Sequence, residues 1–153
     1  MRIATWNVNS IRARQDRVSA LLERENLDVL AIQETKCRPE QFPSEPFTAA
    51  GYEVAVHGAN QWNGVAIISR VGLEDVQRDF PSQPAYANPG KEPVVEPRAI
   101  SATCGGVRIF SLYVPNGREL SHPHYRYKLS WLENLRKYAS SLLSLIHISE
   151  PTR

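Results

Sequence analysis

The chain has 153 residues, 42% of them hydrophobic, so it can bury one hydrophobic core, and nothing in it marks a second domain. The net charge is only +2, which by itself gives little support for a nucleic-acid partner. Two cysteines, Cys37 and Cys104, are too few for a disulfide framework, and neither a secretory signal nor a membrane-length apolar run is present, so we expect a cytoplasmic protein.

The first half of the chain is predicted to form a strand, a helix and a second strand. Residues Arg2–Val8 alternate in polarity, whereas Arg17–Glu25 repeats hydrophobic residues at helical spacing. Asn26 is expected to end this helix, because asparagine tolerates the left-handed conformation found there. Asp28–Gln33 is a hydrophobic strand, and the proline-bearing segment Cys37–Pro46 is predicted to be a surface loop.

The second half is predicted to add strands, one long loop and one helix. Repeated prolines make Phe80–Pro97 a loop rather than regular structure. Hydrophobic residues recur at helical spacing from Pro123 to Leu142, with the proline in the first turn, which predicts a helix. The four strands expected here are Tyr52–Val56, Gly64–Arg70, Arg98–Thr103 and Val107–Val114.

This order of elements predicts an α/β fold. Strands such as Val29–Ile32 are hydrophobic throughout rather than alternating, which is typical of a sheet with both faces covered. We therefore expect an α/β sandwich of two sheets flanked by helices.

Polar side chains gather at the ends of three predicted strands. Asn7 and Asn9 follow the first strand, Glu34 and Lys36 the second, and Tyr113 and Asn116 the last. In sheets covered by helices, ligands bind where strands end and loops gather. The sequence therefore predicts that a carboxylate, amides and a phenol converge there.

Glu34 directly follows a hydrophobic run and so holds a charge at the rim of a core. Such a carboxylate is costly unless it is paired or bound to a metal. One interpretation is an ion pair with Lys36 or an arginine. The other is a metal ligand, since magnesium is commonly held by one or two carboxylates together with water and substrate phosphate. Glu34 alone does not decide between them.

The other polar residues also have two interpretations each. Asn7 and Asn9 can bond a phosphate oxygen, or they can simply end a strand in a turn. Tyr113 can donate to a phosphate or pack in the core. The basic residues beside the strand ends and the turn residue Trp62 suit contacts with nucleic acid, although solvation and loop packing explain them as well.

Four segments together resemble the exodeoxyribonuclease III branch of the endonuclease/exonuclease/phosphatase superfamily. They are W-N-V-N-S-I-R-A, D-V-L-A-I-Q-E-T-K, N-G-V-A-I-I-S-R and S-L-Y-V-P-N-G, in family order across residues 1–143. The resemblance implies the two-sheet sandwich of that superfamily and a monomeric DNA-repair nuclease. Such an enzyme removes nucleotides from 3′ ends of duplex DNA and cuts beside abasic sites, with Mg²⁺ or Mn²⁺ as its cofactor.

The resemblance also implies roles for individual residues. Glu34 would bind the metal, Asn7 would be an active-site amide at or near it, and Tyr113 would contact the scissile phosphate. The residues implied to support this shell are Asn9, Lys36 and Asn116. The residues expected to approach DNA are Arg12, Trp62, Asn63, Arg98 and Arg118.

The sequence departs from the family's pattern in its last part. The family continues with a strand ending in G-D-x-N, a later aspartate and an S-D-H motif, and none of these occurs here. Residues 1–143 are therefore predicted to be the N-terminal part of one nuclease domain, inactive alone, since general acid–base help is worth about 10²–10⁴-fold. Residues 144–153 do not resemble the family and are interpreted as a translated adapter, a sequence artefact.

Two other functions stay open. The protein could hydrolyse a phosphoester other than DNA, although the R-A after Ile11 and the Y-V-P-N-G segment favour the nuclease branch. The chain could instead be a non-catalytic or inert fragment. A DNA-binding fragment would show salt-dependent duplex binding without turnover.

Overall fold

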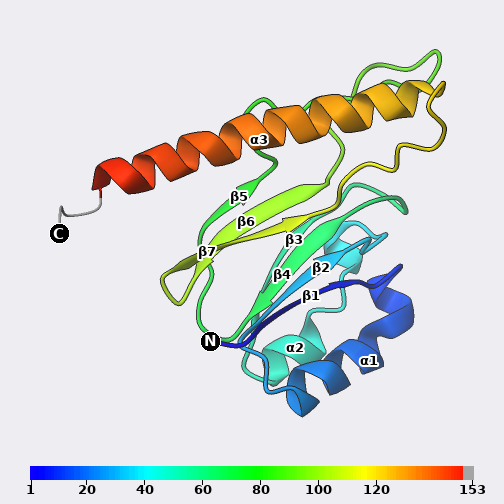
Figure 1. Cartoon of the computed structure of the whole chain (residues 1–153). Coiled ribbons are helices and arrows are strands. Elements are labelled where there is room, and N and C mark those ends of the chain that lie inside the picture. Colours follow the sequence, from blue (N-terminus) through cyan, green and yellow to red (C-terminus); the bar gives the residue numbers. More distant parts are fainter. Residues whose placement is uncertain (150–153) are drawn as a thin grey trace. The chain divides into compact units, whose positions relative to one another are not determined.

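The structure, a computed structural model, describes residues 1–149 of a chain that divides into two compact units. The first unit combines Met1–Asp79 with Glu96–Tyr113 and holds both sheets (Figure 1). The second unit combines Phe80–Val95 with Val114–Arg153. Each unit is described by itself below.

Two sheets form the framework of the first unit. One has the strand order β1-β2-β4-β3, with β1 and β2 parallel and the other pairs antiparallel. Its strands are β1 (Ile3–Asn7), β2 (Val29–Gln33), β3 (Glu53–His57) and β4 (Val65–Ser69). The other sheet is antiparallel, in the order β5-β6-β7, and comprises β5 (Glu74–Arg78), β6 (Ala99–Cys104) and β7 (Val107–Leu112).

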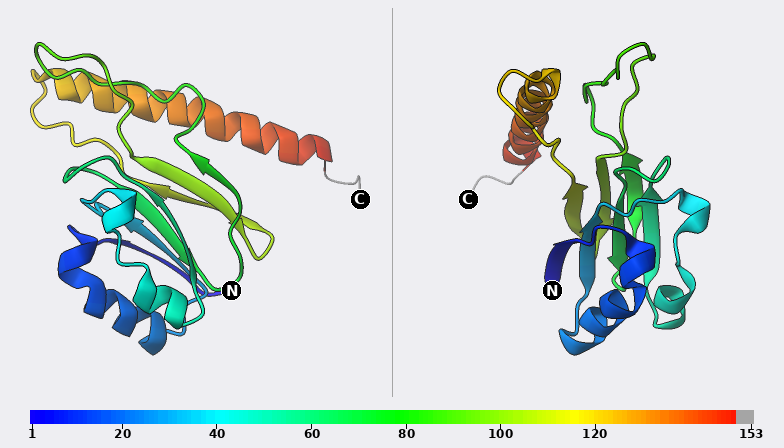
Figure 2. Two further views of the ribbon diagram at one scale, coloured as in Figure 1. Left: turned by 180° about the vertical axis from the view of Figure 1, so that it is seen from behind. Right: turned by 90° about the vertical axis from the view of Figure 1, so that its right-hand side faces the viewer.

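The first sheet is covered on both faces, as Figures 1 and 2 show. Its outer face carries the helices α1 (Ile11–Arg24) and α2 (Glu45–Ala49), and its inner face meets the second sheet. Alternate residues of the strands divide between two cores. Leu30 of β2 belongs to the core under the helices, whereas Val29 belongs to the core between the sheets. Every residue of β2 and β4 is buried, which confirms the predicted α/β sandwich.

Three elements differ from the sequence prediction. Helix α1 begins at Ile11 rather than Arg17, because Ile11 is fully buried and the Ser10 hydroxyl accepts a hydrogen bond from the Ala13 amide (3.3 Å). The predicted loop Cys37–Pro46 is partly wrong, since it contains the 3₁₀ turn η1 (Pro39–Gln41) and the start of α2. Strand β5 was not predicted. Its polar, mostly exposed residues carry no alternation, and pairing with β6 holds them extended.

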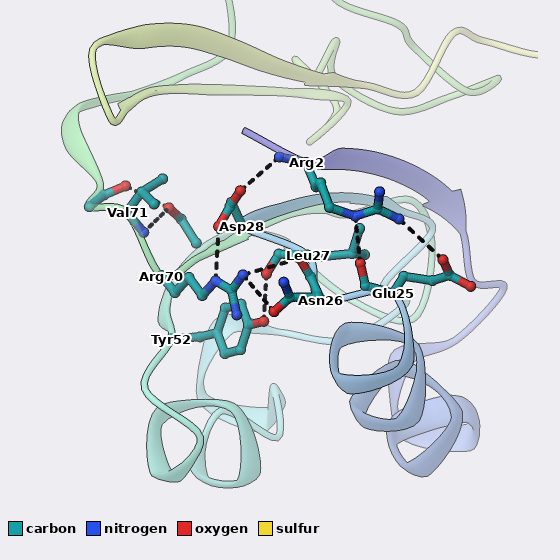
Figure 3. Close-up of polar contacts among 10 residues, drawn as sticks. Arg2, Glu25, Asn26, Leu27, Asp28, Tyr52, Arg70 and Val71 are labelled. Carbon is teal, nitrogen blue, oxygen red and sulfur yellow. Dashed lines mark hydrogen bonds and ion pairs between the residues drawn. The ribbon is translucent and has the colours of Figure 1, made fainter.

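A polar cluster ties the C-terminal end of α1 to the first sheet (Figure 3). Asn26 adopts a left-handed conformation (φ 50°), as the sequence predicts for the residue that ends this helix. Arg70 donates to Asp28 (2.9 Å) and to both the backbone and the side-chain oxygen of Asn26. The Tyr52 hydroxyl donates to the Leu27 carbonyl (2.6 Å). These bonds satisfy the helix end, so the cluster has a structural role.

The second unit consists of the proline-rich loop and the helix α3 (Pro123–Ser149). The predicted loop is confirmed as irregular apart from one isolated bridge, between Tyr86 and Val94. Phe80 packs edge-on against the fully buried Trp131, with ring centroids 5.1 Å apart. The predicted helix from Pro123 is confirmed.

The predicted boundary after residue 143 falls within α3, and residues 150–153 lie outside the described part of the chain. The separation of residues 144–153 from the family therefore stays a prediction. None of the described helices combines the length and hydrophobicity that crossing a membrane requires.

Candidate active site

The ends of β1 and β2 and the segment before β4 are joined by backbone hydrogen bonds. Because β1 and β2 are parallel, their C-terminal ends meet, and the amides of Val8 and Ser10 donate to the carbonyls of Gln33 (3.0 Å) and Glu34 (2.8 Å). The Lys36 amide in turn donates to the Asn63 carbonyl (2.9 Å). Three segments distant in sequence thus form one rim.

The backbone of Glu34 determines where its side chain lies. In a continuing strand, Glu34 would share the face of Ile32, which belongs to the core under the helices. Glu34 instead adopts a left-handed conformation (φ 56°). Its carboxylate is therefore free to leave the helix side and lie near Asn7 and Tyr113, both of which lower its pKa.

Backbone strain is concentrated along the same rim. Non-glycine residues with positive φ in it are Asn9, Ser10, Glu34, Lys36 and Asn63. Each such conformation costs about 1–3 kcal/mol and persists only where the surrounding structure enforces it. Strain of this kind clusters at functional sites, so the rim is the candidate site of this unit.

The Glu34 carboxylate is held in its charged form. Burial alone would raise its pKa, but hydrogen bonds from Tyr113 and Asn7 and the charge of Lys36 outweigh burial and hold the pKa below its usual value. The Lys36 ammonium lies 3.6 Å from the Glu34 carboxylate, and the Glu34 side chain is 19% exposed. An ionised carboxylate with limited access to solvent therefore lies at the rim.

Tyr113 is held in its neutral, hydrogen-bond-donating form. Burial and the neighbouring Glu34 carboxylate raise the pKa of Tyr113 to about 12. The guanidinium of Arg98 lies over the ring, 4.7 Å from its centre, and opposes this rise only in part. The half-buried ring also packs against the core between the sheets, as the structural interpretation predicts, and its contact with a phosphate stays a prediction.

Arg98 is buried, with only 4% of its surface exposed. Its guanidinium pairs with Glu96 (3.0 Å) and donates to the Tyr113 carbonyl (3.3 Å). Glu96 in turn accepts a hydrogen bond from the Asn63 side chain (3.1 Å). Arg98 therefore supports Tyr113 and the segment before β4, and a contact of Arg98 with DNA stays a prediction.

The structure brings most of the other predicted residues to the rim. The Lys36 ammonium donates to the Asn9 side chain, and the Arg12 guanidinium lies 3.5 Å from the Lys36 carbonyl. Trp62 is 61% exposed, as a residue that contacts DNA would be. Asn116 and Arg118 belong to the second unit, where the Arg118 amide donates to the Asn116 side chain (2.7 Å).

Two polar groups near the rim were not predicted. Gln33 is buried beneath Glu34, and its signal in the sequence is a polar residue at the end of a hydrophobic run. His57, which ends β3, pairs with Asp79 (2.8 Å), although the two residues are distant in sequence and share no motif. Only the folded chain reveals the pairing of His57 with Asp79.

The donor set fits a hard divalent cation in part. Glu34 supplies an ionised carboxylate and Asn7 an amide, and oxygen ligands of this kind suit Mg²⁺ and Mn²⁺. Across residues 1–149, no group of three or more His, Cys, Asp and Glu side chains is close enough to hold a metal. Magnesium commonly takes only one or two carboxylates and completes its shell with water and substrate phosphate, so Glu34 with Asn7 can hold one side of such an ion.

Gly64 is expected to tolerate no side chain. Its φ is +95°, and a Cβ would lie 2.0 Å from the Thr35 hydroxyl. Gly72 has nearly the same φ (+99°) but open space around it, which makes it a matched control. We expect Gly72→Ala to lower the free energy of unfolding by about 1–3 kcal/mol through backbone strain, and Gly64→Ala to cost at least about 1 kcal/mol more through the clash. Urea denaturation measures both, and equal losses would contradict the clash.

Tyr113 is expected to make stability depend on alkaline pH. Its pKa is raised from 10.0 to about 12, so its contribution to stability is fully present below pH 10 and is lost as pH rises toward 12. The free energy of unfolding, measured by urea denaturation across this range, should fall more steeply for the native chain than for Tyr113→Phe. Identical slopes would show that Tyr113 titrates alike in the folded and unfolded chain.

Comparison with known proteins gives a consistent family match. A sequence model of the endonuclease/exonuclease/phosphatase family matches residues 4–148. Exodeoxyribonuclease III of Haemophilus influenzae is 28% identical over 122 residues, which cover 80% of this chain and 44% of that protein.

Two solved structures share the fold at higher sequence identity. The 3′ phosphatase NExo from Neisseria, bound to a product DNA hairpin, is 34% identical with a TM-score of 0.84, covering 94% of this chain and 53% of that one. An AP endonuclease from Archaeoglobus fulgidus is 40% identical with a TM-score of 0.77, covering 90% and 51%. The chain thus spans about half the length of the relatives it matches.

Proposed function

The chain belongs to the endonuclease/exonuclease/phosphatase family, and we propose that it carries the metal-binding side of a DNA-repair nuclease active site of the exodeoxyribonuclease III type. The observation that carries this proposal is the meeting of Glu34, Asn7 and Tyr113 at one rim. An ionised carboxylate, an amide and a phenol kept neutral are the groups that a phosphodiester-hydrolysing site requires on one side of the phosphate.

The proposed substrate is duplex DNA, with 3′ ends or abasic sites as the points of attack. Matches to an exodeoxyribonuclease III, to an AP endonuclease and to a 3′ phosphatase bound to DNA support this substrate class. Exposed Trp62 next to the rim supports it as well, because an aromatic side chain can stack on or wedge between bases. The cytoplasmic location and the monomeric state stay predictions.

Each residue at the rim has a distinct task in this proposal. Glu34 and Asn7 would hold Mg²⁺ or Mn²⁺, which when bound neutralises phosphate charge and activates water. Tyr113 would turn its hydroxyl from the Glu34 carboxylate to donate a hydrogen bond to a phosphate oxygen, and its raised pKa keeps that hydroxyl protonated throughout the physiological range. Lys36, fixed between Glu34 and Asn9, adds a positive charge beside the phosphate.

We further propose that the chain by itself turns over no DNA. Among the described residues, Glu34 belongs to no group of three or more His, Cys, Asp and Glu side chains that could hold a metal. The sequence also lacks the family's G-D-x-N and S-D-H motifs, so the general acid–base help that those motifs would supply, worth about 10²–10⁴-fold, is missing. The predicted activity belongs to a protein that also supplies the family's remaining motifs.

The purified chain tests these proposals in three measurements. We expect it to bind Mn²⁺, detected by electron paramagnetic resonance, and to bind a fluorescent abasic-site duplex with an affinity that falls as salt rises. We expect no cleavage of that duplex in Mg²⁺. Cleavage that Glu34→Ala abolishes would overturn the proposed inactivity. If the chain bound neither Mn²⁺ nor the duplex, the proposed metal site and the proposed substrate class would both be overturned.

A further inference from the structure

A hydrogen-bonded triangle of Gln33, Thr5 and Ser111 lies beneath the rim, buried at Gln33 and Ser111 and exposed at Thr5. The Gln33 amide donates to the hydroxyls of Thr5 (3.0 Å) and Ser111 (3.0 Å). The Ser111 hydroxyl donates to the Ile32 carbonyl (2.8 Å). Gln33 is 9% exposed and Ser111 fully buried, so the bonds of Ser111 to Gln33 and Ile32 form in a low-dielectric interior, where polar networks are strong when satisfied. The bond to Thr5 is only partly buried.

This triangle and the candidate site use the same three chain segments. Thr5 precedes Asn7 by two residues on β1, and Ser111 precedes Tyr113 by two residues at the end of β7. Residues two apart on a strand share a face, so the corresponding side chains lie one step below those of the rim. Gln33 is the residue directly before Glu34. The triangle is therefore the layer beneath the Asn7, Glu34 and Tyr113 side chains.

We propose that Gln33 is a positioning residue that holds Asn7, Glu34 and Tyr113 in one geometry by tying β1, β2 and β7 together. This inference rests on the proposed function, because a positioning residue requires a site to position. The hydrogen bonds of Gln33 themselves involve neither metal nor DNA. Gln33 is the one described side chain that hydrogen-bonds to both β1 and β7 in this layer. Without Gln33, β1 and β7 lose the side chain to which both are hydrogen-bonded directly under the site.

The chemistry of glutamine suits this task. Its amide nitrogen has two donors, one for Thr5 and one for Ser111, and its carbonyl can accept from the Thr5 hydroxyl (3.3 Å). A glutamate would lose both donors and would place a second negative charge beneath Glu34. A hydrophobic residue of equal length would leave the Thr5 and Ser111 hydroxyls without this partner.

The alternative is that Gln33 only satisfies the buried Ser111 hydroxyl and contributes stability. Ser69 provides a control for that role, because it is fully buried in the same sheet and its hydroxyl makes two bonds, to Gly72 (2.8 Å) and from Val71 (3.1 Å). Ser69 pairs with Val29 at the opposite end of β2 from Gln33. Ser69→Ala therefore removes buried hydrogen bonds without touching the site.

The test compares Gln33→Met, Ser111→Ala and Ser69→Ala in the full chain. The first readout is the side-chain amide resonance of Asn7 in a nitrogen–proton correlation spectrum without metal. Ser111 and Asn7 lie on different strands that Gln33 connects, so we expect this resonance to move in both Gln33→Met and Ser111→Ala but not in Ser69→Ala. The second readout is Mn²⁺ affinity, which should fall about 10–100-fold in the first two variants only.

The outcomes separate this inference from the proposed function. An unmoved Asn7 resonance in Ser111→Ala, or an equal shift in Ser69→Ala, would overturn the positioning role. If Gln33→Met fails to fold, Ser111→Ala decides by the same readouts. If the native chain binds no Mn²⁺, the proposed metal site fails. The Asn7 resonance, which is measured without metal, still tests the role of Gln33.

Discussion

Glu34→Gln is expected to lower the Mn²⁺ affinity of the chain by at least about 100-fold. Loss of a residue that only supports a metal ligand costs about 10–100-fold, and this substitution removes the charged ligand itself. The substitution preserves the shape of the side chain, and its carbonyl can still accept from the Tyr113 hydroxyl. Electron paramagnetic resonance of free Mn²⁺ at pH 7 measures the affinity, and the thermal midpoint checks that the fold is retained.

Glu53→Gln is the matched control for this prediction. Glu53 is an exposed glutamate at the start of β3, at the end of the sheet opposite the rim, and its substitution should leave the affinity unchanged. Equal losses in both variants would mean that Mn²⁺ binds diffusely to surface charge. An unchanged affinity in Glu34→Gln would leave the ion pair with Lys36 as the role of this carboxylate.

Arg98→Met is expected to lower the free energy of unfolding by about 3–5 kcal/mol. Removing one partner of a buried ion pair leaves the other charge uncompensated, which is among the most costly single changes. Here Glu96 would lose a guanidinium that is only 5% exposed, and the Tyr113 carbonyl and ring would lose a donor and a cation. Urea denaturation measures the loss.

Arg38→Met provides the comparison at the surface. Arg38 and Glu40 form an exposed pair with side chains 55% and 67% accessible, so we expect a loss of about 0–1 kcal/mol. Adding Glu96→Gln to Arg98→Met should recover part of the larger loss, because both charges are then removed. A loss for Arg98→Met no greater than that for Arg38→Met would show that the buried pair contributes little.

The two interpretations of Glu34 prove compatible in the structure. Lys36 lies close enough to form an ion pair, as the simpler interpretation predicts. Asn7 and Tyr113 also lower the pKa of the same carboxylate, which an ordinary surface pair does not require. A cation that binds Glu34 would compete with the Lys36 ammonium, which Asn9 can retain through its side-chain oxygen.

Elements with a strong local signal were predictable from the sequence. The strands β2 and β4, hydrophobic in all but their last residue, and the regularly spaced helix α3 carry patterns that only one type of structure satisfies. The start of α1 was not predictable, because the polar residues after Ile11 hide the turn that the Ser10 cap begins. Strand β5 has no pattern of its own and is extended because β6 pairs with it.

The sequence by itself determined the α/β sandwich, the family and the three strand ends that carry Asn7, Glu34 and Tyr113, because hydrophobic periodicity and motif order are properties of the chain. Only the tertiary structure decided how these side chains meet. Strict strand alternation would put Glu34 on the helix side, and the left-handed backbone at that residue allows it to bond with the other two. The bonds of Gln33 to β1 and β7 likewise depend on sheet packing, which no local pattern encodes.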